Sequence, residues 1–537
     1  MEGVLEEEEA RSVGVWAWLS LSSLLLGGLL ALLWLRNSQQ RNHRLLLLPP
    51  GPSGLPLLGY LPWIDSRAPY ETFAGLSRRY GRIYSLKLGD MLAVFISDPQ
   101  LVRQAFSRPV FSGRAPLYLT HGIMKGHGLI CAEGESWREH RRFVMNVMKQ
   151  LGMAGRQGAS VMESRVMAGV LEFVHGLECQ VSTGVGGVGG VDLVPGLRHC
   201  IGNIINGVVF GRTYAADDPT WIWLQHLLDQ GVKQVAVAGP INFLPVLRFL
   251  PSYRKIMSFI LDGQAETHRH YQEIIDQRQL NLSANQDYTS VVEAYLIEME
   301  RRKSAGIPTE TFTTVQLHHL LADMFGAGTD TALTTIKWIV LYLILYPDVQ
   351  ERIHEEIERV VGQLDQGRIP CYATDAQRMP WTEATICEVQ RIKTILPLGV
   401  PHGTLQDCEL AGYRIPKGAM VVPVWWAMNL DPTLWPEPLQ FRPERFLVAR
   451  QEEEEEEEGK WRVEKPDHFL PFQCGRRMCI GDDLGRTLIF LFTVTLLQHF
   501  RLSFPPQFAE YSANNFPPPD YGFTLVPHPF PVALHPR

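Results

Sequence analysis

A short segment near the end of the chain, Phe472 to Gly481, restricts the possible folds more than any other feature. It reads Phe-Gln-Cys-Gly-Arg-Arg-Met-Cys-Ile-Gly. A thiolate at Cys479 can serve as the axial ligand of a haem iron, and thiolate ligation favours cleavage of the O–O bond. Gly475 lacks a Cβ and so allows a tight turn beneath a porphyrin, and Arg477 can reach a haem propionate through a charge-assisted pair. The segment therefore predicts a haem-thiolate centre in preference to a structural cysteine in a loop.

Composition excludes several other classes of protein. The chain has 537 residues, of which 45% are hydrophobic, and this is enough for a large core. Its net charge of −7 comes from two acidic runs, Glu6 to Glu9 and Glu452 to Glu458, and the remainder is mildly basic. Because the sequence contains no run of lysine and arginine, it predicts no nucleic-acid partner. The eight cysteines show no paired spacing, which fits a reducing compartment better than a disulfide framework.

The N-terminal part of the chain predicts a membrane anchor. Residues 12–35 carry no charge and are rich in leucine, and a bilayer-spanning helix needs about 20 apolar residues. An acidic tail, residues 1–11, precedes this stretch, and a basic, proline-rich linker, residues 36–56, follows it. The positive-inside rule then places the catalytic domain, residues 57–537, in the cytosol. A cleaved signal peptide or a mitochondrial transit peptide fits less well, because the apolar stretch is long and its leader is acidic.

Periodicity predicts a mainly α-helical protein with small β-sheets. Alternating residues in Arg82 to Leu88 and in Met91 to Ser97 predict a β-hairpin around an intervening Gly-Asp pair. From Trp137 to about Tyr346 the patterns are mostly helical. Proline-rich sequence follows, with single strands expected at Met420 to Val424 and Thr524 to Val526.

Two other patterns in the sequence are weak as site motifs. Residues 184–189 read G-x-G-x-x-G, but the strand, helix and downstream acid of a dinucleotide site are not convincing, so we expect a flexible loop. Cys474 and Cys479 resemble half of a zinc site, but no second Cys/His pair accompanies them and the H-E-x-x-H pattern is absent.

One long helix is expected to carry the proton-transfer residues. It runs from Thr313 to Tyr346, with Thr313 or Thr314 as N-cap and a proline as stop. Its middle reads Ala-Gly-Thr-Asp-Thr, in which Gly328 can loosen the helix. Oxygen activation requires protons, and an acid beside a hydroxyl, here Asp330 and Thr331, is a suitable relay. A polar kink in a buried helix is the alternative, and the cysteine segment downstream favours the relay.

Several motifs together resemble those of the cytochrome P450 family, and in particular its microsomal members. Beside the cysteine segment, Ala327 to Thr331 matches A/G-G-x-D/E-T, Glu388 to Arg391 matches E-x-x-R, and Pro443 to Phe446 matches P-E-R-F. The resemblance covers nearly the whole chain after the linker. It implies the cytochrome P450 fold, preceded by one N-terminal transmembrane helix, and a haem b whose iron is bound axially by Cys479.

The family resemblance also assigns structural residues. Glu388 and Arg391 lie at i and i+3 of an expected helix, and such pairs are usually exposed and weak. The resemblance instead implies a buried triad of Glu388, Arg391 and Arg445 that locks the loop carrying Cys479. We interpret this triad as structural and not as catalytic.

Four residues are implied to contact the haem propionates. Trp137 and Arg141 lie at i and i+4, on one face of a helix, and the family uses this pair for the propionates together with Arg477. His402 follows a proline and also matches a propionate contact of microsomal members. For His402 alone, a surface or core histidine would be the simpler interpretation.

The resemblance implies partners and a location. The sequence contains no credible flavin or nicotinamide site, so electrons are expected from an NADPH-dependent flavoprotein reductase (NADPH–cytochrome P450 reductase) in the same membrane. A basic surface around Arg138, Arg142 and Lys149 is expected to meet the acidic face of that reductase. The apolar stretch Pro240 to Leu250 is expected to face membrane lipid, with core packing as the alternative. The implied location is the endoplasmic reticulum membrane, single-pass, with a cytosolic catalytic domain.

Two stretches resemble the arthropod ecdysteroid 25-hydroxylases more closely: Gly113 to Met124 followed by Gly126 to Ala132, and Asp217 to Trp221 together with Ile241 to Pro245. This resemblance implies a lipophilic steroid substrate and O₂, with hydroxylation at carbon 25 of the side chain. A generalist xenobiotic or fatty-acid hydroxylase, a haem-thiolate isomerase and a non-enzymatic haem sensor remain as alternatives. Apolar residues are expected to hold the substrate: Leu117 to Met124, Phe325, Ala327, Leu396 to Val400, and Phe523.

Overall fold

The computed structural model describes residues 48–537 apart from 154–158, 185–188, 235–238, 281–286, 365–367, 451–460 and 523. The predicted anchor at 12–35, the acidic tail and most of the linker therefore lie outside the described residues. So do the acidic run at 452–458, part of the glycine-rich pattern at 184–189, and Phe523.

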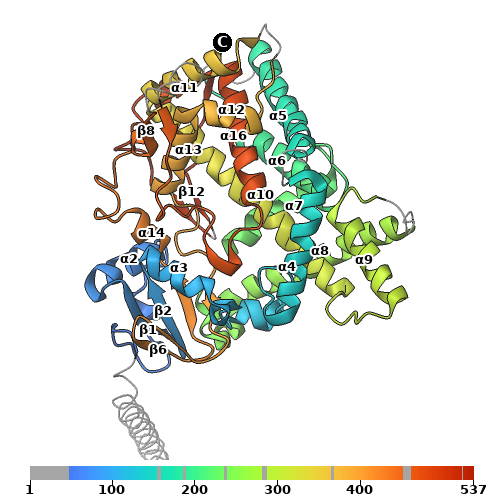
Figure 1. Cartoon of the computed structure of the whole chain (residues 1–537), viewed down its shortest axis with the longest axis vertical. Coiled ribbons are helices and arrows are strands. Elements are labelled where there is room, and N and C mark those ends of the chain that lie inside the picture. The colour runs from blue at the N-terminus through green and yellow to red at the C-terminus, as the bar shows by residue number, and fades with distance from the viewer. Residues whose placement is uncertain are drawn as a thin grey trace, which may run out of the picture.

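A five-stranded sheet joins segments from both halves of the chain (Figure 1). β1 (Ile83–Leu88) pairs antiparallel with β2 (Met91–Ile96), which confirms the predicted hairpin. β2 pairs in parallel with β7 (Met420–Pro423), and β4 (His402–Gly403) and β3 (Gly113–Arg114) complete the order β1-β2-β7-β4-β3. Because β3 and β4 lie at one edge of this sheet, they bring the chain just after residue 112 beside the chain just after residue 401.

The rest of the body is mainly helical, as predicted. Most of the buried apolar side chains belong to one large cluster among the helices, and a second cluster packs between the sheet and α2. The helices are α2 (Pro69–Tyr80), α3 (Pro99–Ser107), α4 (Gly134–Met148), α5 (Ala159–Ser182), α6 (Val194–Val209), α7 (Pro219–Gln234), α8 (Pro251–Leu280), α9 (Val291–Ala305), α10 (Thr314–Leu345), α11 (Pro347–Val360), α12 (Tyr372–Asp375), α13 (Pro380–Ile392), α14 (Trp425–Asn429) and α16 (Asp482–His499).

Four two-stranded sheets complete the described part of the fold. They pair β5 (Cys408–Leu410) with β6 (Tyr413–Ile415), β8 (Leu447–Ala449) with β9 (Trp461–Val463), β10 (Phe500–Ser503) with β13 (Ala533–Pro536), and β11 (Asp520–Tyr521) with β12 (Leu525–Val526).

α10 is the long helix expected from the sequence, and it passes through the helical body (Figure 1). The Thr313 side chain caps it by accepting a hydrogen bond from the Gln316 amide, and Pro347 begins the next helix directly. Among the described residues α10 is the one helix long and apolar enough to cross a bilayer, but 72% of its apolar window is buried inside the protein. Its neighbours α6, α8, α13 and α16 cover it, so its apolar composition is that of a core helix.

Candidate haem-thiolate site

The loop that carries Cys479 is held in a tight turn. The Cys479 amide donates to the carbonyl oxygen of Phe472 at 3.0 Å, and the Met478 amide donates to that of Gly475 at 3.1 Å. Gly475 has a φ of +76°, and a Cβ at this position would collide with the backbone of Phe106 in α3. Only glycine satisfies both conditions, so the tight turn expected at Gly475 is confirmed.

The thiol of Cys479 is reachable, although protein atoms surround it. The side chain is exposed, yet burial of the thiol, and then the charge of Asp482, raise its pKa above the ordinary value. The Gly481 amide, Arg141 and Arg486 act in the opposite direction and favour the thiolate. Because a thiol that coordinates a metal is deprotonated by the metal itself, the raised pKa is compatible with a ligand role.

Three of the predicted residues meet beside this loop. α4 places Trp137 and Arg141 on one face, and the guanidinium of Arg477 lies 4.0 Å from the centre of the Trp137 ring. The guanidinium of Arg141 lies 5.9 Å from the same ring and donates a 2.7 Å hydrogen bond to the carbonyl oxygen of Met478. Cation–π contact of this kind orients an arginine without neutralising it.

Three arginines near the loop, Arg114, Arg141 and Arg477, lack carboxylate partners among the residues that the structure describes. Arg477 is buried and donates only to backbone carbonyl groups. Arg114 in β3 is also buried, and it donates to the carbonyl oxygens of Ile130 and Val400. Burial and neighbouring cations lower the pKa of Arg477 to about 7, and burial lowers that of Arg114 to about 10. Within the described part of the chain neither they nor Arg141 form an ion pair, so the cluster fits an acidic group.

His402 lies beside the same arginines, and one of its ring nitrogens has no hydrogen-bonding partner in the described part of the chain. β3 and β4 put it directly opposite Arg114, its ring stacks on Phe106 at 3.7 Å, and its Nδ1 hydrogen-bonds with the Phe111 carbonyl at 2.8 Å. Its Nε2 is buried and has no hydrogen-bonding partner among the described residues. Burial and the charges of Arg114 and Arg477 hold the pKa of His402 well below its usual value. Because Nδ1 must donate to the carbonyl, Nε2 of the neutral ring carries a lone pair. Since buried polar atoms are normally paired, an outside hydrogen-bond donor or a proton fits here.

Sequence reasoning missed Arg114 as a site residue. The distance of Arg114 from the other motifs along the sequence does not indicate that it lies near them. Only the pairing of β3 with β4 brings it to the site. The stretch Gly113 to Met124 was noted only for its resemblance to steroid hydroxylases.

Asp330 and Thr331 lie on α10 but have different partners. Asp330 accepts a 2.8 Å hydrogen bond from the hydroxyl of Thr524, and burial raises the pKa of Asp330. The hydroxyl of Thr331 donates back to the carbonyl oxygen of Ala327 at 2.7 Å. Successive helical side chains diverge by about 100°, so the two do not contact each other directly. Thr524 is a partner that the sequence did not indicate.

The expectation that Gly328 loosens α10 is wrong. The helix runs without interruption from Thr314 to Leu345. A Cβ on Gly328 would lie 3.0 Å from the Ile205 side chain of α6. The glycine therefore permits close packing of two helices. The neighbouring Ala327 is exposed although Phe325 and Thr329 on either side are buried.

The buried triad is confirmed. Glu388 pairs with Arg391 at 2.7 Å and with Arg445 at 3.0 Å, and the first two side chains are fully buried. Arg391 also donates to the carbonyl oxygens of Asn429 and Pro438. These hydrogen bonds connect the triad to the segment before the cysteine loop and not to the loop itself. The triad can therefore influence the position of Cys479 only through that segment.

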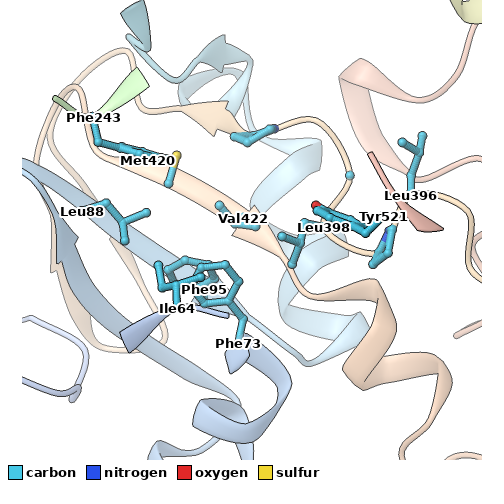
Figure 2. Close-up of a pocket in the computed structure, with 13 residues that line it drawn as sticks. Ile64, Phe73, Leu88, Phe95, Phe243, Leu396, Leu398, Met420, Val422 and Tyr521 are labelled. Carbon is cyan, nitrogen blue, oxygen red and sulfur yellow. The ribbon is translucent and has the colours of Figure 1, made fainter. Parts of the chain in front are cut away.

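A small apolar pocket, partly open to solvent, lies between the sheet and the chain around Leu396. Figure 2 shows Phe73 and Phe95 together in this pocket, with Leu398 and Tyr521 to one side of them. Leu396, Leu398 and Gly399, which are among the residues expected to hold the substrate, line this pocket, whereas Phe325, Ala327 and residues 117–124 do not. Cys479 does not line it either. Gly399 lies between the pocket and the cysteine loop. It packs so closely on the loop that a Cβ at this position would lie 3.2 Å from the side chain of Gln473.

The fold and this loop define a haem-thiolate protein, and comparison with known proteins gives the family. The cytochrome P450 family model matches residues 49–533, so the chain belongs to the cytochrome P450 family of monooxygenases. The family implies a haem whose iron is bound by a cysteine thiolate.

Individual relatives match over nearly their full length. The chain is 37% identical to Cytochrome P450 306a1 of Drosophila melanogaster, over 95% of this chain and 93% of that protein. It is 34% identical to Cytochrome P450 18a1 of the same organism, over 95% and 91%. It is 32% identical to human Cytochrome P450 2U1, over 96% and 94%. None of these names states a substrate.

Proposed function

We propose that this chain is a membrane-bound monooxygenase in which Cys479 is the axial ligand of haem b. The exposed thiol at a rigid turn, beside cations that lack carboxylate partners, is the observation that carries the proposal. Haem bound in this way supplies activation of O₂ and insertion of one oxygen atom into a C–H bond.

The residues around the loop have separable tasks in this proposal. Arg114, Arg141 and Arg477 hold the acidic propionates, and His402 adds a donor at Nε2 when the negative charge of a propionate favours protonation of its ring. Trp137 keeps the two guanidinium groups of Arg141 and Arg477 in place by stacking. Charge-assisted hydrogen bonds to carboxylates are about twice as strong as neutral ones, so loss of any of these arginines weakens haem retention.

Asp330 and Thr331 are proposed to supply protons. The raised pKa of Asp330 makes its carboxyl a readier proton donor near neutral pH than an exposed aspartate. Thr331 is half-buried, next to the exposed position of Ala327, where a water can meet its hydroxyl. Because the two side chains do not touch, the relay between them needs a bridging water or a rotation of Thr331.

Replacing Asp330 with asparagine is expected to uncouple the enzyme. Removal of a general acid typically lowers a rate by about 10²-fold or more. We therefore expect a comparable fall in product per NADPH consumed, with an unchanged spectrum of the CO-bound ferrous haem. Asp262→Asn makes the same chemical change at an exposed position of α8 and serves as the control. Normal coupling in Asp330→Asn would remove Asp330 from the relay.

A flavoprotein reductase is the proposed electron donor. Arg138, Arg142 and Lys149 are exposed on or directly after α4. The same helix carries Arg141, which contacts the cysteine loop at Met478. A negatively charged partner attracted to this surface would therefore approach Cys479 from the side of its loop.

The proposed location is the endoplasmic reticulum membrane, with the catalytic domain in the cytosol. The exposed apolar side chains of Val246, Phe249 and Leu250 support contact of residues 240–250 with lipid. Phe243 from the same stretch lines the apolar pocket. A lipophilic substrate would then pass from the bilayer to the pocket along one continuous apolar segment.

The proposed reaction is 25-hydroxylation of an ecdysteroid precursor. It rests on the resemblance of residues 113–124, 126–132, 217–221 and 241–245 to the arthropod ecdysteroid 25-hydroxylase known as Phantom. Two of these stretches meet in the fold, because the Leu119 amide donates to the Asn242 side chain at 3.1 Å. The lining of the pocket is mostly apolar, which is the character that a site for a lipophilic ligand requires. A generalist hydroxylase would use the same chemistry with a less selective pocket.

Direct assay of turnover tests this choice. Microsomes containing the full chain and a reductase should convert an ecdysteroid ketodiol, with NADPH, to one product that carries a new hydroxyl at carbon 25. Mass spectrometry and NMR locate the hydroxyl. Several products, or equal turnover of lauric acid offered in parallel, indicate the generalist enzyme. An intact thiolate-type CO spectrum without ketodiol turnover removes the steroid assignment and leaves the haem site standing.

A further inference from the structure

Four histidine rings meet where the loop before α4 contacts α8 and α10. The ring centre of His127 lies 5.3 Å from that of His319. His268 on α8 lies 4.7 Å from His319 and 4.9 Å from His318. The three elements come from distant parts of the sequence, so the cluster exists only in the folded chain.

Three of these rings have unused nitrogens. His318 shares a 3.0 Å hydrogen bond with Gln272. Among the described residues His127, His268 and His319 have no hydrogen-bonding partner, and His319 is only 7% exposed. In the described part of the fold the ring nitrogens of these three histidines are not fully buried, so solvent or a dissolved ion can reach them. These nitrogens are therefore free to bind something that the protein itself does not provide.

The chemistry of the cluster indicates a metal ion. Burial, followed by the neighbouring histidines, lowers the pKa of His268 and His319 to about 4, so both rings are neutral at pH 7. A neutral imidazole offers one lone pair, and it is a preferred ligand of zinc, copper and nickel. The nearest acids have other tasks: Asp323 accepts from two loop amides, and Asp276 accepts from Gln272. The candidate metal ligands are therefore all histidine nitrogens.

We propose that His127, His268 and His319 bind one divalent transition-metal ion, with Zn²⁺ as the test ion. Zn–N bonds of about 2.0–2.1 Å in a tetrahedral site place imidazole centres about 5 Å apart. The separations of His127 and of His268 from His319 are close to this value, whereas no ring contact among the described residues joins His127 to His268. In the described part of the chain no three such side chains already surround one point. Binding therefore includes rotation of the rings about their terminal torsions, which are broad for histidine.

An ion at this site ties the loop to two helices. The loop is already fixed to α10, because Gly128 exchanges two hydrogen bonds with Gln316, and the Leu129 and Ile130 amides donate to Asp323. A bond from the same ion to His268 adds α8 to this connection. The bound ion is expected to reduce opening of the loop, whose Leu129 carbonyl oxygen also accepts a hydrogen bond from Arg477.

Calorimetric titration of the full-length holoprotein with ZnCl₂, after removal of any histidine tag, tests the site. We expect one ion per chain, and at least about tenfold weaker binding in His268→Gln and in His319→Gln, since even outer-shell changes cost a metal site that much. His226→Gln removes an exposed histidine from α7 and is the matched control. The CO-bound spectrum checks that each variant retains its fold and haem.

Hydrogen exchange supplies an independent measurement. Zn²⁺ should slow amide exchange in residues 124–130 of the parent protein and of His226→Gln, but not in His268→Gln. The proposal is overturned if the parent binds no stoichiometric ion. It is equally overturned if both cluster variants bind Zn²⁺ as tightly as His226→Gln, since the ion then lies elsewhere.

Discussion

Replacement of Cys479 with alanine is expected to abolish substrate turnover and the thiolate-type spectrum of the CO-bound ferrous haem. The other groups around the loop can still hold the propionates, so some haem should remain bound without its sulfur ligand. Absorbance of the reduced, CO-treated protein, together with a haem assay, separates loss of the ligand from loss of the cofactor. The physical reason is that alanine has no atom that can bind iron.

Cys474→Ala provides a matched control within the same loop. Cys474 lies five positions earlier, is buried among apolar side chains, and burial raises the pKa of its thiol to about 11. We expect this variant to retain the thiolate-type spectrum. If Cys474→Ala loses the spectrum while Cys479→Ala keeps it, the assignment of the ligand is wrong.

Glu388→Gln is expected to destabilise the fold by about 3–5 kcal/mol, the usual result of removing one partner from a buried ion pair. The change is nearly isosteric, but it leaves the guanidinium groups of Arg391 and Arg445 without their carboxylate. Urea unfolding, followed by circular dichroism and by haem absorbance, measures the loss. We also expect a lower yield of holoprotein from cells.

Glu383→Gln is the control on the same helix, α13. Glu383 pairs with Lys465 at 3.2 Å near the surface, and pairs of this kind contribute about 0–1 kcal/mol. If the free energy of unfolding falls no more in Glu388→Gln than in Glu383→Gln, the triad contributes little to stability. If haem absorbance is lost at a lower urea concentration than the circular dichroism signal, the triad acts mainly on the position of the cysteine loop. Residues 429–445 would transmit this effect.

Local pattern was sufficient for the elements whose geometry depends on near neighbours. The β1–β2 hairpin follows from alternation around a Gly-Asp turn, and α10 follows from its cap, its length and the proline after it. The cysteine turn follows from glycine at position 475. In each case the decisive contacts lie within a few residues along the chain, apart from the close approach of Phe106 to Gly475.

Other site features depend on contacts between distant segments. Arg114 belongs to the cation cluster only because β3 pairs with β4, and Asp330 has a hydrogen bond only because Thr524 lies beside α10. Gly328 was interpreted from sequence as a weak point, whereas its position against Ile205 shows a packing requirement. Such relations need the tertiary structure, since nothing in local spacing encodes them.

The class of chemistry and the main helices could be predicted, because the cysteine turn, the acid–hydroxyl pair and the periodicity of the helices are each encoded in consecutive residues. Only the tertiary structure decided which cations lack partners, where Asp330 finds its hydrogen bond, and that four histidines share one place. The physical reason is that burial and unpaired charge are properties of the environment, and the environment is built by residues hundreds of positions apart.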